Sequence, residues 1–302
     1  MKDKRFAGVL PILHTPFTPD GAIDEASLRR QVAFCLRARV HGVVIPAGTS
    51  EFFALSDAER TKLIALTLDE VDGRVPVIAC ASAGAKETVL EHCRSADAQG
   101  AAGLLIMPPY IRKPDSTGIF AFFQALAETV SVSIVIQDAP GPMGVPMSSE
   151  LIGRIVRDVP GTWYVKEEVP PSGERISVLL KHHGDHLTGV FGAGSGSRLL
   201  DELGRGSCGA MPSAAFATVN VRIYEAFCRS DMAAARDLYC RALPLMVLRD
   251  QYMQAMGKLI LQRMGVIAHT TVRDPATVFP DEVAVGEMDR LLAELRPLMS
   301  PD

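Results

Sequence analysis

A lysine stands where a short apolar run ends, and its position suits amine chemistry. Residues 162–165 are aromatic and β-branched, which predicts a buried strand that ends at Lys166. An ammonium group loses much of its hydration there, so burial favours the neutral amine, which can attack a ketone to form a Schiff base. The alternative is an ordinary ion pair, in which Lys166 reaches toward solvent beside Glu167 or Glu168.

The composition of the whole chain fits a globular enzyme. The 302 residues are 48% hydrophobic and 22% charged, enough for one large α/β domain or two small ones. The net charge of −4 gives no basis for expecting a nucleic-acid surface. Residues 1–6 lack a secretory signal, and no apolar run approaches the roughly 18 residues of a membrane span. We therefore expect a cytoplasmic protein with no membrane or nucleic-acid partner.

The cysteines indicate neither a disulfide framework nor a zinc site. None of the six forms a CxxC pair, and in a chain of this length that spacing predicts reduced, buried thiols. They are Cys35, Cys80, Cys93, Cys208, Cys228 and Cys240.

Apolar strands and amphipathic helices alternate eight times before residue 230. Strands are predicted at 8–13, 42–46, 76–81, 103–107, 133–136, 162–165, 187–191 and 207–211. The intervening helices include 24–39, 86–99, 117–130, 149–159, 174–183, 198–203 and 217–228, and another that Ser56 caps with Glu59. Eight even repeats favour a (β/α)8 TIM barrel over an open doubly wound sheet, because each parallel strand needs a crossover helix.

After Asp231 only helices are predicted, at 232–248, 251–264 and 281–298. We therefore divide the chain into a catalytic barrel, 1–230, and a C-terminal helical region, 231–302. The apolar residues of this region favour a homo-oligomer, a dimer or tetramer, unless they bury on their own barrel. They are Met232, Leu238, Leu243, Leu245, Met246, Leu259, Ile260 and Met264.

The active site of a parallel barrel lies at the carboxyl ends of its strands. This rule brings together the candidate catalytic residues Tyr110, Gln137, Lys166 and Glu168. It also places the candidate substrate-binding residues Thr49, Ser50, Asp138 and Gly192 at the same end. The histidines at 182, 183 and 186 fall at the opposite end, where a solvated helix end is a better interpretation than a metal site. The glycines of residues 192–196 fit neither a dinucleotide loop nor a nucleophile elbow, but they would let a substrate approach the backbone. We expect no metal and no cofactor.

These motifs together resemble the dihydrodipicolinate synthase / N-acetylneuraminate lyase family of Schiff-base barrels. The resemblance rests on residues 15–17, the loop 48–52, residues 108–110, Lys166 and residues 204–209. It implies that Lys166 forms an imine with a small 2-keto acid and that the loop Gly48, Thr49, Ser50 binds its carboxylate. It also implies that Tyr110 relays protons, often across a subunit contact.

The departures from that family pattern count against dihydrodipicolinate synthesis. The usual loop Gly-Thr-Thr-Gly-Glu becomes Gly48-Thr49-Ser50-Glu51 after an alanine, with one hydroxyl lost. Gln137 replaces the tyrosine of the fifth strand, and an amide cannot take and return a proton as a phenol does. The arginine that captures the second substrate is missing from residues 141–144.

Several short runs resemble the 2-keto-3-deoxy-L-arabonate dehydratase branch. They are QDAP at 137–140, MPPY at 107–110, KEEVP at 166–170 and GVIA at 265–268. The resemblance implies dehydration of a 2-keto-3-deoxy sugar acid. Glu168 lies two residues past Lys166 and shares its face if the strand continues, where it would act as an acid or base or form a structural ion pair. The alternatives are a pyruvate-forming aldolase, a synthase of the same family, or a keto-acid-binding protein without catalysis.

Overall fold

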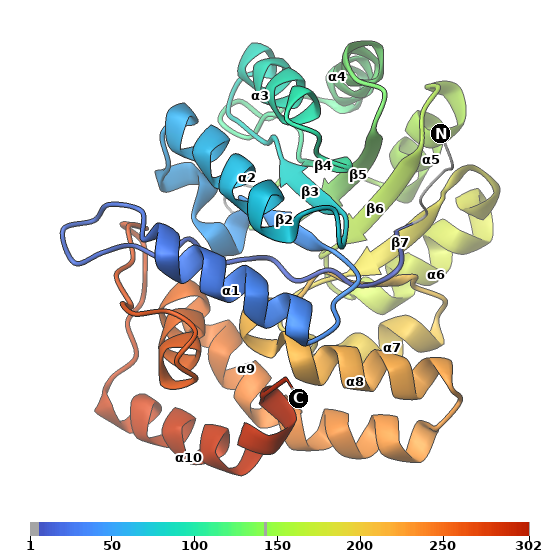
Figure 1. Cartoon of the computed structure of the whole chain (residues 1–302). Coiled ribbons are helices and arrows are strands. Elements are labelled where there is room, and N and C mark those ends of the chain that lie inside the picture. Colours follow the sequence, from blue (N-terminus) through green and yellow to red (C-terminus); the bar gives the residue numbers. More distant parts are fainter. Residues whose placement is uncertain (1–5, 142–143, 302) are drawn as a thin grey trace.

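A computed structural model describes residues 6–141 and 144–301, so the segment 141–144 lies partly outside the described ranges. Its eight strands form one parallel sheet in the order β1-β8-β7-β6-β5-β4-β3-β2 (Figure 1). They are β1 (Gly8–Val9), β2 (Val43–Ile45), β3 (Val77–Cys80), β4 (Gly103–Ile106), β5 (Ser133–Asp138), β6 (Trp163–Glu167), β7 (Gly189–Gly192) and β8 (Gly209–Ala210). A parallel bridge between Ile12 and Val44 joins the chain after β1 to β2, which closes the sheet into a barrel.

A helix follows each strand and covers the outside of the barrel, which confirms the predicted (β/α)8 fold. The helices are α1 (Glu25–Arg37), α2 (Asp57–Val71), α3 (Lys86–Ala98), α4 (Ser116–Thr129), α5 (Ser149–Asp158), α6 (Ser172–His183), α7 (Leu199–Gly204) and α8 (Ala217–Cys228). Asp24 caps α1 by accepting from the Ser27 amide, and Ser56 and Glu59 form the predicted capping box of α2. Short 3-10 turns η1 (Gly48–Ser50), η2 (Phe52–Ala54), η3 (Gly184–His186) and η4 (Ala214–Phe216) were not predicted.

The C-terminal region consists of α9 (Met232–Arg263) and α10 (Glu282–Met299). The predicted break at residues 249–250 is wrong, because the chain stays helical there and kinks at Met253, where φ is 46° and ψ is −114°. α9 contacts α8, α10, η1 and η4, so it reaches from the outer helices to the loop after β2. The domain boundary at residue 230 stays a prediction.

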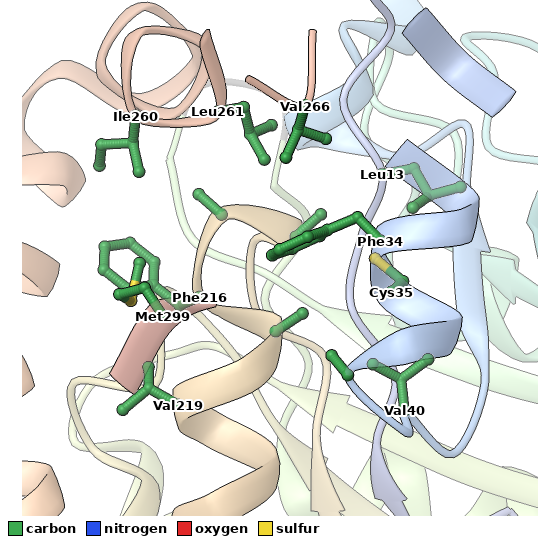
Figure 2. Packing of buried hydrophobic residues seen from close by; sticks show 14 of the residues in the cluster. Leu13, Phe34, Cys35, Val40, Phe216, Val219, Ile260, Leu261, Val266 and Met299 are labelled. Atoms are coloured by element: carbon green, nitrogen blue, oxygen red, sulfur yellow. The ribbon is translucent and has the colours of Figure 1, made fainter. Parts of the chain in front are cut away.

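The largest hydrophobic cluster joins this region to the barrel. Figure 2 shows Phe34 and Cys35 of α1 facing Phe216 and Val219, with side chains from the C-terminal region beside them. Leu245, Met246 and Ile260 are fully buried in the same cluster. Of the apolar residues that favoured an oligomer, these three are therefore buried within the chain, while Met232 is exposed. The oligomeric state stays a prediction.

Two cysteines depart from the expectation of buried thiols. All six are free, and Cys35, Cys80 and Cys93 are buried, but Cys228 and Cys240 are exposed. Cys228 ends α8, and Cys240 lies within α9. Among the described helices, none has both the length and the apolar character needed to cross a membrane.

Candidate active site

The site is built on two neighbouring strands, β5 and β6, which place Gln137 directly opposite Lys166. Successive side chains of a strand point to opposite faces. Val135 and Tyr164 belong to the cluster that fills the barrel interior, so Gln137 and Lys166, two residues further on, face the same interior at its mouth. The Lys166 side chain is only 3% exposed.

Glu168 joins this pair through one carboxylate oxygen. Its amide donates to the Asp138 carbonyl at 2.9 Å, which carries the strand pairing one step beyond β6 and keeps Glu168 on the face of Lys166. Its Oε1 accepts from Lys166 Nζ at 2.7 Å and from Gln137 Nε2 at 2.6 Å. The carboxylate is therefore within reach for proton transfer at the lysine nitrogen. Glu168 is 23% exposed, so the ion pair lies inside the mouth and Lys166 does not extend to solvent.

The loop after β2 supplies the predicted carboxylate-binding residues. Thr49 is mostly buried, and its Oγ1 lies 3.5 Å from Arg249 Nη2. The Ser50 hydroxyl donates to the Leu13 carbonyl and accepts from the Ala47 amide, so both of its roles are used within the backbone. Ser50 thus shapes the loop, whereas the contact given for the Thr49 hydroxyl is with the side chain of Arg249.

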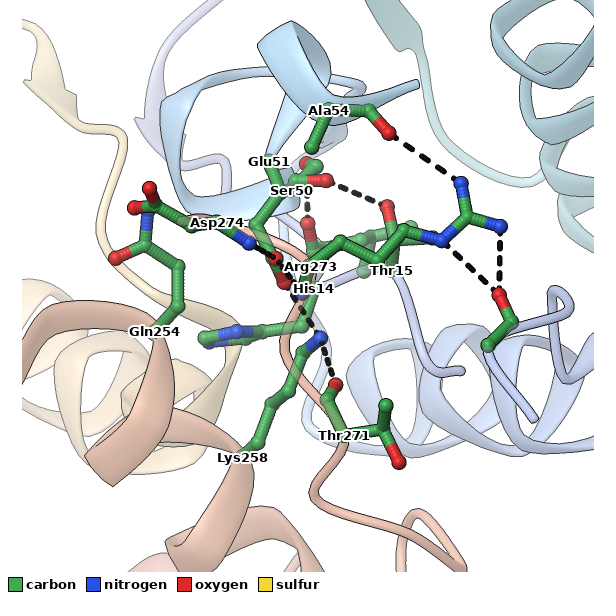
Figure 3. A network of polar contacts seen from close by, with 12 residues as sticks. His14, Thr15, Ser50, Glu51, Ala54, Gln254, Lys258, Thr271, Arg273 and Asp274 are labelled. Carbon is green, nitrogen blue, oxygen red and sulfur yellow. Dashed lines mark hydrogen bonds and ion pairs between the residues drawn. The ribbon is translucent and has the colours of Figure 1, made fainter. Parts of the chain in front are cut away.

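A buried ion pair holds this loop in place (Figure 3). Glu51, at φ 59°, is fully buried, and its Oε1 accepts from Lys258 Nζ at 2.5 Å. Its Oε2 accepts from the backbone amides of Arg273 and Asp274 at 2.6 and 2.9 Å. Lys258 also donates to the Thr271 carbonyl at 2.7 Å. The C-terminal region therefore fixes the conformation of a loop that the sequence placed in the site.

Tyr110 follows β4 and is half-buried at the same mouth. Its ring packs edge-on against Phe52, with 6.1 Å between the ring centroids. Burial raises the pKa of the Tyr110 phenol, and the nearby Arg60 partly opposes that rise. In the described structure Tyr110 makes no hydrogen bond to Lys166, so packing is the role that its contacts show and the proton relay stays a prediction.

Asp138 and Gly192, predicted to touch the substrate, face the outside of the barrel. Asp138 is next to inward-facing Gln137, so strand alternation turns its carboxylate outward, where it pairs with Arg175 at 2.5 Å. A Cβ at Gly192 would clash with the carboxylate of Glu202 on the outer side. These two positions therefore support the strand ends, and their side-chain positions do not contact the mouth.

Asp138 shares its outer site with Glu167 and Arg175. Arg175 Nε lies 3.1 Å from Glu167 Oε1, which also accepts from the Val169 amide at 2.8 Å. Burial, reinforced by the negative charge of Asp138, raises the pKa of Glu167 to about 8, and burial also raises the pKa of Asp138. Two carboxyl groups thus surround one guanidinium on the outer side of β5 and β6.

Nothing in the sequence predicts that side chains of α9 lie against the loop after β2. Arg249 is 2% exposed and contacts Asp250 and Thr49. Gln254, on the other side of the kink, donates to the Gly48 carbonyl at 3.3 Å. An analysis of hydrophobic periodicity places charged helix residues on the solvent face. The apolar neighbours Leu245 and Met246 were the sequence signal that this part of the helix faces inward.

The histidines at the other end of the barrel form no metal site in the structure. His182 and His183 end α6 with 6.3 Å between their ring centroids, and the His183 ring lies against Gly153. Throughout the described ranges, no group of three or more His, Cys, Asp or Glu residues is arranged to hold a metal ion. The absence of a metal requirement stays a prediction.

A buried lysine beside a carboxylate at the mouth of a parallel barrel suits an enzyme that works through a lysine amine. The chain belongs to the dihydrodipicolinate synthetase family, whose sequence profile matches residues 5–292. Members of this family are lyases with a Schiff-base mechanism.

Relatives of this chain with known names differ in the reaction that they catalyse. The chain is 32% identical over 303 residues to the L-2-keto-3-deoxyarabonate dehydratase of Azospirillum brasilense, covering 98% of this chain and 96% of that protein. It is 34% identical over 244 residues to the 4-hydroxy-tetrahydrodipicolinate synthase of Methanopyrus kandleri, covering 79% of each. The solved dihydrodipicolinate synthase of Thermotoga maritima superposes with a TM-score of 0.89 at 26% identity, covering 96% of this chain and 98% of that one.

Proposed function

We propose that this chain dehydrates a 2-keto-3-deoxy sugar acid through a Schiff base on Lys166. The observation that carries the proposal is Glu168 Oε1, which lies 2.7 Å from Lys166 Nζ and 2.6 Å from Gln137 Nε2. The carboxylate of Glu168 thus lies between Lys166 and Gln137, and the amide of Gln137 cannot act as a general base. The similarity to the dehydratase of Azospirillum brasilense supports the same assignment.

The reaction begins when Glu168 takes a proton from Lys166, and the free amine attacks the C2 ketone. Glu168 returns the proton as the carbonyl oxygen leaves as water, which gives a protonated imine and a free carboxylate. Glu168 removes a proton from C3, and the electron pair moves into the imine to form an enamine. The enamine expels the C4 hydroxyl, which takes the proton from Glu168 and leaves as a second water. Hydrolysis of the imine consumes one water and frees Lys166, so the net loss is one water.

The fate of the carbon chain follows from this elimination. With a five-carbon substrate, loss of the C4 hydroxyl leaves unsaturation beside the C5 hydroxymethyl group. Proton shifts convert that terminus to an aldehyde, so the product is 2-ketoglutarate semialdehyde. The net loss is the C4 oxygen, because water replaces the C2 oxygen when the imine is hydrolysed.

The other residues at the mouth receive narrower roles. Gln137 donates to Glu168, which leaves its carbonyl oxygen to accept from a substrate hydroxyl. Thr49 binds the keto-acid carboxylate, while Gly48 and Ser50 shape the loop. Tyr110 borders the site and is the proposed second proton carrier.

Product analysis tests the proposal directly. The enzyme should convert 2-keto-3-deoxy-L-arabonate, or its C4 epimer, to a product lighter by one water, followed by mass spectrometry and NMR. Lys166→Arg should give no product, because a guanidinium stays protonated and forms no imine. Release of pyruvate would identify an aldolase instead. Lack of turnover on every 2-keto-3-deoxy acid, together with pyruvate binding, would identify a keto-acid-binding protein.

We also propose that the chain forms a homo-oligomer, a dimer or tetramer, in keeping with its family. Analytical ultracentrifugation at micromolar concentration measures this state. A monomer at every concentration would contradict it.

A further inference from the structure

We propose that Arg249 binds the C1 carboxylate of the 2-keto acid together with Thr49. This inference rests on the proposed Schiff base at Lys166, which places C2 of the substrate at the mouth. The loop after β2 resembles the carboxylate-binding loop of its family but lacks one of the usual hydroxyls at Gly48. In this proposal, Arg249 of α9 supplies hydrogen-bond donors in place of the missing hydroxyl. This helix lies outside the eight repeats of the barrel.

The first observation is that the Arg249 guanidinium is buried with donors to spare. A guanidinium carries five N–H donors. Arg249 Nη1 lies 3.2 Å from Asp250 Oδ1, and Nη2 lies 3.5 Å from Thr49 Oγ1, a long hydrogen bond. Its Nε is buried and has no hydrogen-bond partner among the described residues. Leaving buried charged donors unused is costly, so this arrangement points to an acceptor that binds there.

The second observation is that Asp250 does not use up the charge of Arg249. The Asp250 carboxylate accepts from Ser195 Oγ at 2.6 Å and from Ser197 Oγ at 3.2 Å, and its side chain is 29% exposed. Hydroxyl donors and solvent therefore share its negative charge. The N–H of Nε and one N–H of Nη2 in Arg249 therefore remain available to a second anion.

The neighbouring titratable groups do not compete for that anion. Lys258, fully buried, is paired with Glu51 at 2.5 Å. His14 lies beside Gly257 of the same helix, and its Nε2 is 2.9 Å from Ser213 Oγ. Burial and the positive charges of Arg249 and Lys258 hold the pKa of His14 well below its usual range, so His14 is neutral.

The third observation is the space beside Thr49. A Cβ added at Gly48 would meet no atom within 4 Å, so the position of the lost side chain is open. Gln254 donates to the Gly48 carbonyl, which holds this part of the loop against α9 next to Arg249. A carboxylate fits the planar fork of an arginine through two parallel hydrogen bonds, and Thr49 Oγ1 adds a third donor.

The test compares two ligands that differ only in the charge of this group. Pyruvate carries the carboxylate, and pyruvamide carries a neutral amide in its place. The rate at which each is trapped on Lys166 by cyanoborohydride, at low ligand concentration, is read from the intact mass of the protein. We expect Arg249→Gln to slow trapping of pyruvate by at least about tenfold and to change trapping of pyruvamide by less than about threefold, because a charged hydrogen bond is lost only with pyruvate.

Two further variants separate binding from folding. Arg249→Lys keeps the charge without the fork, so its loss for pyruvate should be smaller than that of Arg249→Gln. Arg236→Gln removes the same charge from an exposed position of α9 and should trap both ligands like the parent. Thermal melts report whether each variant is folded.

An equal loss with both ligands, or no loss with either, would overturn the proposal and leave Arg249 a structural residue. If Arg249→Gln does not fold, the ratio of the two ligands in Arg249→Lys decides, and an unchanged ratio counts against carboxylate binding. Failure of the dehydratase proposal is distinguishable, because pyruvate trapping that depends on Arg249 needs no dehydration. A parent enzyme that traps no pyruvate at all would overturn both.

Discussion

Replacing Lys258 by methionine tests how strongly the C-terminal region holds the loop after β2. The substitution keeps the length and apolar stem of the side chain and removes the ammonium group that lies 2.5 Å from Glu51 Oε1. Glu51 then stays fully buried, with the two backbone amides of residues 273 and 274 as its remaining donors.

The expected cost follows from the contacts that are lost. Breaking a buried ion pair from one side costs roughly 3–5 kcal/mol, because the other charge stays buried. Lys258 also lies 4.4 Å above the Phe17 ring, which adds about 1 kcal/mol, while the amides on Glu51 offset part of the loss. We expect Lys258→Met to lower the free energy of unfolding by about 4 kcal/mol. Glu51→Gln with Lys258→Met should cost only about 1–2 kcal/mol, since no charge is then left unpaired.

Urea denaturation at one fixed protein concentration measures these differences. The single tryptophan, Trp163, is buried in β6, and its fluorescence reports the barrel. Lys62→Met is the matched control, because Lys62 pairs with Glu25 at the surface and should cost less than about 1 kcal/mol. A cost below about 1 kcal/mol for Lys258→Met, or a double variant as unstable as the sum of its single variants, would refute the reasoning.

Three further outcomes are expected. Gln137→Tyr should slow dehydration by at least about tenfold, which raises the activation free energy by about 1.4 kcal/mol, because the bulkier ring crowds Glu168. Steady-state kinetics measures this rate, and a rate equal to that of the parent would remove Gln137 from the mechanism. Because folding raises the pKa of Glu167 from 4.5 to about 8, the protonated carboxyl contributes its full stabilisation of the fold below pH 4.5. That stabilisation is lost as the pH rises through about 8. Unfolding free energies from pH 5 to 9 should therefore fall more steeply in the parent than in Glu167→Gln, and parallel curves would contradict this assignment. Met253→Gly should keep or raise the melting temperature, because its φ of 46° and ψ of −114° suit glycine. Arg236→Gly, at an exposed position inside the regular part of α9, should instead lower the free energy of unfolding by about 1 kcal/mol. Equal losses in the two variants would show that the backbone at Met253 is not strained.

The repeating pattern of the chain predicted the barrel because its physical basis is local. Each strand is an apolar run and each helix is amphipathic, so both periods can be read within about a dozen residues. The same rule placed Lys166 at a buried strand end and Glu168 on its face. The strand lengths differ mainly at β1 and β8, where pairing with the next strand, and not the apolar pattern, decides where the strand ends.

The side chains around that pair could be predicted less well, because tertiary contacts decide them. Asp138 follows Gln137 by one residue, and one residue is enough to turn a side chain to the other face of a strand. Arg249 reads as a solvated helix residue, since its burial depends on a loop 200 positions away. Ser50 reads as a ligand-binding hydroxyl, although the backbone carbonyl of Leu13 and the amide of Ala47 occupy it.

The Glu51–Lys258 pair has a consequence for how the protein is made. The two residues are 207 positions apart, and a ribosome adds roughly 5–20 residues per second, so Glu51 waits on the order of 10–40 seconds for its cation. Lys166 and Glu168 are synthesised well before Lys258. The lysine and its carboxylate are therefore present before Lys258 can hold the loop after β2 in place. Translation order therefore delays a complete site until most of the chain has been synthesised. A product truncated before α9 lacks Lys258 and the amides of residues 273 and 274, so none of these donors is available to Glu51.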